Sequence, residues 1–218
     1  MKRNKLFIGS RASKLALIYA NKVKNEISKH YNKEIIIKEI NTTGDNKIDI
    51  RLSELGGKGL FSKNIENELL NKNIDLAVHA LKDLPSFDTE GLVTNCFLKR
   101  NNSNEVMISN SNKKLNDLVP GSIVGTSSFR REFQLKRIRK DLNFKLIRGN
   151  VDTRIRKLKS GEYDAIILAK AGLSSLNLDK EITQEFSNND LIPSAGQGTI
   201  AVPVSYTHLR AHETRSYL

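Results

Sequence analysis

The fold is decided by the stretch Lys5–Ile27, KLFIGSRASKLALIYANKVKNEI, which joins a short apolar run to a longer amphipathic one. Lys5–Gly9 is apolar and ends at a glycine, which predicts a strand. Ser13 can cap the segment that follows, whose apolar residues recur at helical spacing. The β-branched run Glu34–Ile40 predicts a second strand, so the chain begins with a strand–helix–strand unit.

The same alternation continues along the chain. We expect helices at Phe61–Asn71, Ser128–Lys140, Val151–Ser160 and Ala171–Leu176, and strands at Ile74–His79, Ser122–Gly125, Phe144–Ile147 and Ala165–Ala169. This order predicts an α/β fold with largely parallel sheets and helices on their faces. We expect two domains, residues 1–98 with about 193–204, and residues 103–190. Residues 205–218, SYTHLRAHETRSYL, resemble translated adapter or vector sequence and are interpreted as a non-native tail, with an ordinary C-terminal tail as the alternative.

The composition excludes several classes of protein. The 218 residues include one cysteine, which rules out an internal disulfide and a multi-cysteine metal site. No apolar run approaches the roughly 20 residues that a membrane span needs. We therefore expect a cytoplasmic protein that holds no metal. Lys and Arg number 36 against 24 Asp and Glu, and the net charge of +12 predicts anionic partners.

Three expected strand-to-helix junctions carry the same chemistry: Ile8–Ser13 (IGSRAS), Val124–Arg131 (VGTSSFRR) and Ile147–Arg154 (IRGNVDTR). A helix N-terminus offers unpaired N–H donors and Arg offers a two-pronged donor, so each junction can bind a carboxylate or a phosphate. The alternative is ordinary capping beside a solvated Arg. Ser128–Lys159, which overlaps two of the junctions, holds twelve Lys or Arg against three acidic residues. None of the three has the spacing of a nucleotide P-loop.

A candidate catalytic carboxylate lies in Ile74–Pro85, IDLAVHALKDLP. Lys82 and Asp83 follow the expected strand, at the sheet edge where ligands of parallel sheets bind. A carboxylate there can give or accept protons, and the neighbouring Lys favours its ionised form. The alternative is a surface ion pair at a turn before the proline. His79 is interpreted as a packed strand residue rather than a ligand.

Two further features have two interpretations each. Gly56–Gly59 (GGKG) includes Lys58 and precedes Phe61, which predicts a flexible hinge that is either a lid over a site or a simple loop. Cys96 lies in the apolar run Leu92–Leu98, which favours a buried structural thiol over a reactive one.

Eight stretches, taken together, are similar to the hydroxymethylbilane synthase family, also called porphobilinogen deaminase. They are GSRASKLAL, TTGD, GGKGLFSKNIE, DLAVHALKDLP, GSIVGTSSFRR, RGNVDTR, EYDAIILAKAGL and IPSAGQG, in this order, and they cover nearly all of residues 5–204. Members of the family join four porphobilinogen molecules head to tail, releasing ammonia each time, and form hydroxymethylbilane for haem and related tetrapyrroles. The resemblance implies three α/β domains, of which the first two resemble type II periplasmic binding proteins.

The resemblance also implies roles for particular residues. Asp83 matches the family's catalytic carboxylate, which contacts pyrrole N–H groups, assists the loss of ammonia and stabilises a cationic azafulvene-like intermediate. The residues expected to hold the carboxylates of cofactor and substrate are Arg11, Ser13, Lys82, Ser128, Arg130, Arg131, Arg148 and Arg154. Lys58 and Phe61 match the family's active-site loop and its surroundings.

Two departures from the family pattern bear on activity. The family primes its growing chain on a dipyrromethane cofactor, which is held by a thioether to a cysteine of the third domain. This sequence stops where that domain should begin, and Cys96 matches a strand of the first domain, so we expect an inactive fragment without the attachment cysteine. Ser174 and Ser175 stand where the family often has a basic residue, so one anion contact is either missing or supplied by Lys170.

Two other function classes fit parts of the sequence. A non-catalytic anion-binding module would need the Arg-rich junctions but not Asp83. A nucleic-acid binder would explain the net charge, but the sequence lacks a recognition-helix motif and interleaved surface aromatic residues. We therefore expect a monomer that binds porphobilinogen and polypyrrole intermediates, and neither nucleic acid nor a membrane.

Overall fold

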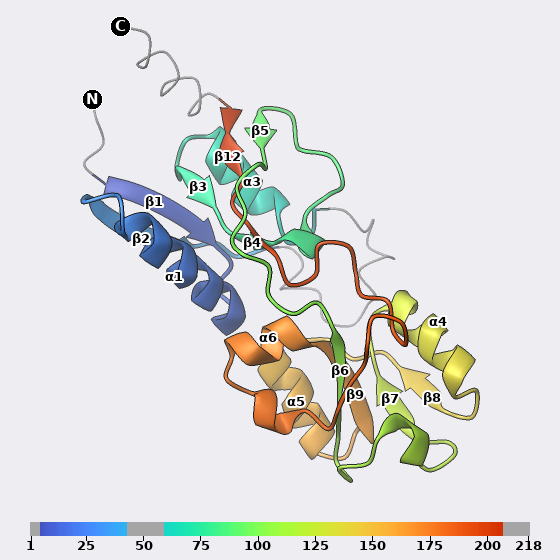
Figure 1. The fold of residues 1–218 in the computed structure, drawn as a ribbon. Helices are drawn as coiled ribbons and strands as arrows, with labels where there is room; N and C mark the ends of the chain where they lie inside the picture. The colour runs from blue at the N-terminus through green and yellow to red at the C-terminus, as the bar shows by residue number, and fades with distance from the viewer. Residues whose placement is uncertain (1–4, 43–58, 207–218) are drawn as a thin grey trace, which may run out of the picture. The chain divides into compact units, whose positions relative to one another are not determined.

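The computed structural model describes residues 5–42 and 59–206, which form two compact units (Figure 1). The first unit is described in residues 5–42, 59–100 and 199–206, and the second in residues 101–198. Lys58, most of the TTGD motif and residues 207–218 of the expected tail lie outside the described residues. Among the described residues, no helix combines the length and the apolar character that crossing a membrane requires.

The first unit is built on a five-stranded sheet. In order across the sheet, its strands are β2 (Glu34–Glu39), β1 (Lys5–Ser10), β3 (Leu76–Ala77), β12 (Val204–Ser205) and β5 (Leu92–Val93). β1 runs parallel to β2 and β3, whereas β12 runs antiparallel to β3 and β5. The helix α1 (Lys14–Ser28) directly follows its expected cap, Ser13, and α3 (Lys63–Leu70) lies within the predicted helix Phe61–Asn71.

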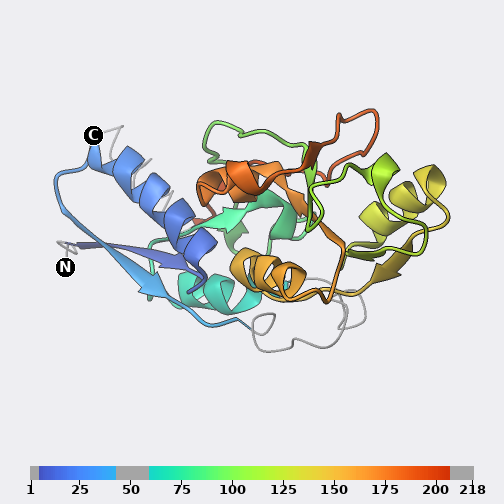
Figure 2. The ribbon, with the colours of Figure 1, turned by 90° about the horizontal axis from the view of Figure 1, so that it is seen from below.

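The two helices cover opposite faces of this sheet. Leu76 of β3 belongs to a buried cluster with Val23 of α1, whereas the next residue, Ala77, belongs to a cluster with Leu69 of α3. Successive residues of a strand point to opposite faces, so α1 and α3 pack on different sides. Figure 2, a view from a second direction, shows α1, in blue, beside β1 and β2.

The prediction of one continuous strand over Ile74–His79 is wrong. The segment divides into β3 and β4 (His79–Ala80), because the returning chain pairs with it at two separate places. β12 pairs with β3, and β11 (Ile200–Ala201) pairs antiparallel with β4 in a small second sheet. A 3-10 turn, η2 (Leu81–Asp83), follows directly, so Asp83 is positioned by β4 rather than by β3.

Cys96 is exposed, so the expectation of a buried thiol is also wrong. β5 ends at Val93, and the rest of the apolar run forms only a single bridge, between Phe97 and Ala201. Because most of this segment is outside a sheet, its alternate side chains have no common buried face to occupy.

The second unit is built on a five-stranded sheet of its own. In order across the sheet, its strands are β10 (Gln184–Glu185), β6 (Glu105–Ser109), β9 (Ala165–Ala169), β7 (Ile123–Gly125) and β8 (Asn143–Lys145). β7 is parallel to β8 and β9, whereas β6 is antiparallel to β9 and β10. The helices are α4 (Phe129–Ile138), α5 (Val151–Lys159) and α6 (Lys170–Ser175), and 3-10 turns occur at η3 (Leu115–Asp117) and η4 (Asp179–Glu181).

Both sheets are mixed, which corrects the expectation of largely parallel sheets. Parallel pairing is imposed where a crossover helix links consecutive strands. β6 and β12 instead follow places where the described chain passes from one unit to the other, near residues 100 and 198. Without a crossover helix before them, these strands are not constrained to run parallel to their neighbours.

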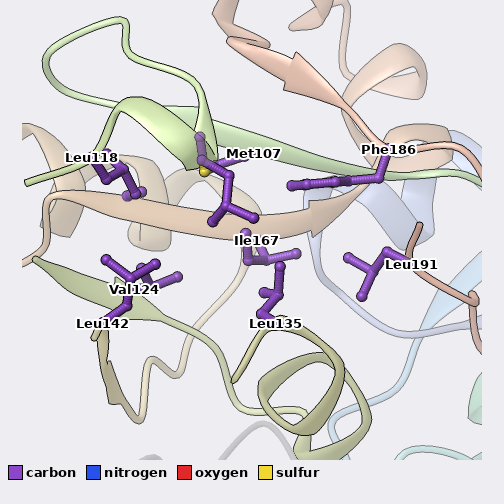
Figure 3. Packing of buried hydrophobic residues seen from close by; sticks show 10 residues of the cluster. Met107, Leu118, Val124, Leu135, Leu142, Ile167, Phe186 and Leu191 are labelled. Atoms are coloured by element: carbon purple, nitrogen blue, oxygen red, sulfur yellow. The ribbon is translucent and has the colours of Figure 1, made fainter. Parts of the chain in front are cut away.

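β9 lies at the centre of the second unit's core. Ile167 is fully buried in a cluster with Met107 and Leu135 (Figure 3). The adjacent Ile166 is fully buried in a second cluster that includes Leu158 of α5. A strand that is covered on both faces needs an uninterrupted apolar sequence, and Ala165–Ala169, AIILA, supplies it.

Candidate functional site

The first group of predicted site residues lies at the edge of the first sheet where β1 ends. β1 and β3 are parallel neighbours, so Arg11 and His79 follow these strands at the same edge. Ser13 caps α1, and its Oγ accepts a hydrogen bond from the backbone N–H of Ala16 (3.3 Å), which confirms the expected cap.

Arg11 stacks on Phe61, with its guanidinium carbon 4.2 Å from the ring centre. Phe61 is half-buried and lies just before α3, so the structure brings a predicted anion-binding residue against a residue of the predicted active-site loop. A stacked guanidinium contacts the ring through its face and donates hydrogen bonds along its edge. The stacking therefore orients Arg11 without using its donor edge.

Asp83 ends the η2 turn and is half-buried. The turn is anchored by a hydrogen bond from the backbone N–H of Leu81 to the carbonyl of Thr199 (2.9 Å). Within the part of the chain that the structure describes, the Asp83 carboxylate makes no hydrogen bond and no ion pair, and the side chain of Lys82 is exposed. Asp83 is therefore a fixed acceptor whose oxygen atoms are not committed to a described neighbour.

His79 is a buried neighbour of this edge that the sequence did not mark as a site residue. It is 4% exposed, and its Nε2 has no hydrogen-bond partner among the described residues. Burial, and then the positive charge of Arg11, lower the pKa of His79 from 6.5 to about 4. The imidazole is thus neutral at physiological pH.

This burial predicts a pH-dependent stability. As the pH falls below 6.5, His79 becomes protonated in the unfolded chain, whereas in the folded chain it becomes protonated only near pH 4. The free energy of unfolding is therefore expected to fall by about 2 kcal/mol between pH 7 and pH 5. Denaturant unfolding of wild type and His79→Gln measures this. His79→Gln should lose most of the dependence of the unfolding free energy on pH, whereas the matched variant His30→Gln, at an exposed position, should keep it. The same pH dependence in all three proteins would contradict the prediction.

The second group of predicted residues lies where β7 and β8 end. These strands are parallel neighbours, so the junctions before α4 and α5 lie at one edge of the second sheet. The Oγ of Ser128 accepts a hydrogen bond from the backbone N–H of Arg131 (3.4 Å) and caps α4. The hydroxyl of Ser127 donates to the carbonyl of Ile147, which joins one junction to the other.

Arg148 and Arg154 flank the second of these junctions. Arg148 is buried, and the Nε–H of Arg154 donates to the carbonyl of Gly149 (2.8 Å). Gly149 has a φ of +108°, and an added Cβ would lie 2.7 Å from the Cγ2 of Thr153. Only glycine fits this backbone, which turns the chain tightly between the two arginines.

Glu105 is a site residue that the sequence analysis missed. It is completely buried at the start of β6, and it accepts hydrogen bonds from Arg130 and Arg131. Burial alone would raise the pKa of Glu105, but Arg131 and then Arg130 hold it below its ordinary value. The sequence feature that could have pointed to Glu105 is its position as a lone acidic residue between an Asn-rich linker and the apolar run Val106–Ile108.

Lys170 and Ser174 already have partners inside the second unit. Lys170 forms an ion pair with Glu185 and lowers the pKa of that carboxyl group by hydrogen bonding to it. The hydroxyl of Ser174 donates to Asp179 (2.5 Å). Lys170 would have to leave Glu185 in order to replace the basic residue that the family often carries nearby.

Comparison with known proteins identifies the family. A family model described as "Porphobilinogen deaminase, dipyromethane cofactor binding domain" matches residues 6–213. The chain belongs to this family. The resemblance inferred from the eight sequence stretches is therefore confirmed, and the matched domain is the one that binds the family's dipyrromethane cofactor.

Two relatives show how much of a porphobilinogen deaminase the chain covers. It is 49% identical over 199 residues to the porphobilinogen deaminase of Bacillus pumilus, covering 89% of this chain and 63% of the relative. It is 47% identical over 201 residues to the enzyme of Geobacillus kaustophilus, covering 90% of this chain and 64% of the relative. The chain thus spans somewhat less than two thirds of the length of these relatives.

Solved structures of ligand-binding proteins share the fold. A Bacillus subtilis protein described as a "putative methionine-binding lipoprotein" matches with a TM-score of 0.53 at 13% identity, covering 95% of this chain and 89% of that one. The ligand-binding component of an ABC-type import system from Staphylococcus aureus matches with a TM-score of 0.54 at 12% identity, covering 97% and 69%. These likenesses confirm an α/β fold of the type II periplasmic-binding-protein kind for this porphobilinogen deaminase family member.

Proposed function

We propose that this sequence carries the substrate-binding and catalytic residues of a hydroxymethylbilane synthase, which condenses four porphobilinogen molecules head to tail and releases ammonia at each step. The observation that carries the proposal is Asp83, a half-buried carboxylate on an anchored turn that has no described partner. Family membership supports it, because the matched domain is the one that binds dipyrromethane in the family.

The charged and polar residues described above fit pyrrole ligands with acidic side chains. Pyrroles present N–H donors, and the acetate and propionate groups of porphobilinogen present carboxylates. Asp83 offers an acceptor for the N–H groups, and guanidinium groups offer paired donors for the carboxylates. The proposed carboxylate-binding residues are Arg11, Ser13 and Lys82 in the first unit and Ser128, Arg130, Arg131, Arg148 and Arg154 in the second.

The proposed role of Asp83 is electrostatic. Loss of ammonia leaves positive charge on the substrate, and an ionised carboxylate held close to the ring stabilises that charge. Phe61 contributes by keeping Arg11 oriented at the same unit's sheet edge. The dipyrromethane cofactor, when bound, supplies the primer to which the growing chain is attached.

Recognition of the carboxylates can be tested on this chain directly. Porphobilinogen is expected to raise the melting temperature, because a ligand that binds only the folded state stabilises it. A 2-aminomethylpyrrole without the acetate and propionate groups should raise it far less, since it cannot engage the arginines. Thermal unfolding with each compound makes the comparison. Equal stabilisation by both compounds, or by neither, would argue against the proposed substrate.

Covalent priming is expected to be absent from this chain. The sequence has a single cysteine, Cys96, which is exposed in the first unit and remote in sequence from the Arg-rich segment. Incubation with porphobilinogen followed by intact-mass spectrometry should show no two-pyrrole adduct, and Cys96→Ser should behave in the same way. A stable adduct on the wild-type chain would overturn the expectation of inactivity without the attachment cysteine.

We also propose that the protein is a cytoplasmic monomer whose physiological anions are pyrrole carboxylates rather than nucleic acid. The presence of a dedicated carboxylate, Asp83, favours this over a non-catalytic anion-binding module, which would have no need of it. Binding of duplex DNA that persists at moderate salt would count against this reading, because nonspecific binding to phosphates weakens steeply with salt.

A further inference from the structure

Both oxygen atoms of the Glu105 carboxylate are used by arginines of α4. Oε1 accepts from the Nη2 of Arg130 (2.5 Å), and Oε2 accepts from the Nη2 of Arg131 (2.7 Å). The Glu105 side chain is 0% exposed, and its backbone pairs with Ala169 at the end of β9. The buried Glu105 carboxylate, at the start of β6, therefore binds two consecutive arginines in the first turn of α4.

Each arginine has a second anchor on a backbone carbonyl. Arg131 donates through Nη1 to Ile167 of β9 (2.9 Å), and Arg130 donates through Nη1 to Ile192. The side chain of Arg131 is 8% exposed and that of Arg130 is 29% exposed. With one anchor on Glu105 and one on a carbonyl, each guanidinium group is fixed in orientation as well as in position.

Charge compensation is the second consequence of this arrangement. Two guanidinium groups side by side repel each other and would attract any small anion without regard to its shape. One buried carboxylate between them reduces the charge of the group from +2 to +1, counting Arg130 and Arg131 against Glu105. A buried carboxylate needs such partners in turn, because an unpaired one would be costly to bury.

We propose that Glu105 is a positioning residue of this anion-binding edge: it holds Arg130 and Arg131 in one orientation and cancels one of their charges, so that the pair selects oriented organic carboxylates over simple anions. We call Glu105 with Arg130 and Arg131 the arginine clamp. The identity of the carboxylate ligand rests on the proposed function, but the arginine clamp does not. Glu105 touches no ligand in this proposal and acts through the two arginines.

The clamp can be tested in the unmodified protein. Nitrogen-15 NMR of the arginine side chains reports how fast each guanidinium group rotates, and Arg130 and Arg131 are expected to rotate slowly, with resolved Nη protons. Fast rotation of both groups would overturn the proposal, and this measurement needs neither a variant nor porphobilinogen.

Selectivity is tested with Glu105→Gln, which keeps the shape of the side chain and removes its charge. Titrations measure the affinity for porphobilinogen and for inorganic sulfate. The ratio of the two affinities is expected to fall about tenfold, a change of about 1.4 kcal/mol, because sulfate gains from the extra positive charge while the oriented ligand loses its fixed partners. Glu105→Asp, which keeps the charge, should restore part of the ratio.

The matched control is Glu181→Gln, since Glu181 is also paired with a basic residue of the second unit, Lys159, but does not touch Arg130 or Arg131. It should leave the ratio unchanged. If Glu105→Gln weakens both ligands equally, or changes neither affinity, the positioning role is wrong. If the wild-type chain binds sulfate but no porphobilinogen, the proposed function fails, while the NMR result and the rise in sulfate affinity still decide the role of Glu105.

Discussion

Replacing Asp83 with Asn is expected to lower the rate of porphobilinogen consumption roughly 10²–10³-fold, the range typical of losing one preorganised electrostatic partner of a transition-state charge. Asn keeps the size of Asp and can still accept a hydrogen bond from a pyrrole N–H. It carries no charge, so the positive charge that develops when ammonia leaves loses its stabilising partner. The measurement is ammonia release by a polypeptide that continues this sequence to the length of its curated relatives.

The control for this variant lies five residues further along the chain. Asp88 is exposed and accepts a hydrogen bond from the backbone N–H of Thr94 (3.3 Å), so Asp88→Asn removes a charge of the same type from a neighbouring loop. Its turnover should remain close to that of wild type. Unchanged turnover in Asp83→Asn would remove the catalytic role and leave the non-catalytic anion-binding module as the better reading.

Replacing Ile167 with Ala is expected to cost about 2–5 kcal/mol of unfolding free energy, because it opens a cavity in a packed core. Ile167 is fully buried at the middle of β9, between Met107 of β6 and Leu135 of α4 (Figure 3). Its carbonyl also accepts the hydrogen bond from Arg131, so a shift of the strand would disturb the arginine clamp as well. Chemical denaturation followed by circular dichroism measures the loss.

Ile192 provides the comparison, since the same substitution there removes the same atoms from an exposed side chain. The residue is 62% exposed in the second unit, and Ile192→Ala should change the free energy of unfolding by less than about 0.5 kcal/mol. Similar losses in the two variants would mean that β9 is not the centre of that unit's core.

The elements that the sequence predicted well are those whose determinants lie close together along the chain. Ser13 and Ala16, whose backbone N–H it caps, are three residues apart, and the apolar residues of α1 recur within one or two turns. The same holds for Ser128 and α4. Capping and helical periodicity depend on local backbone geometry, so no knowledge of the rest of the fold is required.

The sequence predicted individual residues of the candidate site but not the contacts between them. The sequence pointed to Arg130 and Arg131 as anion-binding residues, and the structure adds that both are held by Glu105, which no local pattern identified. The run Leu92–Leu98 was apolar enough to suggest a buried strand, yet Cys96 is exposed because most of that run has no sheet partner. Apolar composition predicts burial only where a neighbouring element exists to cover it.

By itself, the sequence determined the α/β class, the order of most elements, the family and the helix caps at Ser13 and Ser128, because these follow from residue types at short spacing. Tertiary structure alone decided three matters: the division of Ile74–His79 into two strands, the mixed direction of the sheets, and the pairing of Glu105 with Arg130 and Arg131. Each depends on segments that are distant in the sequence and meet only after folding. Hydrogen bonding and charge compensation between such segments are set by which strands become neighbours, and periodicity along one strand cannot encode that choice.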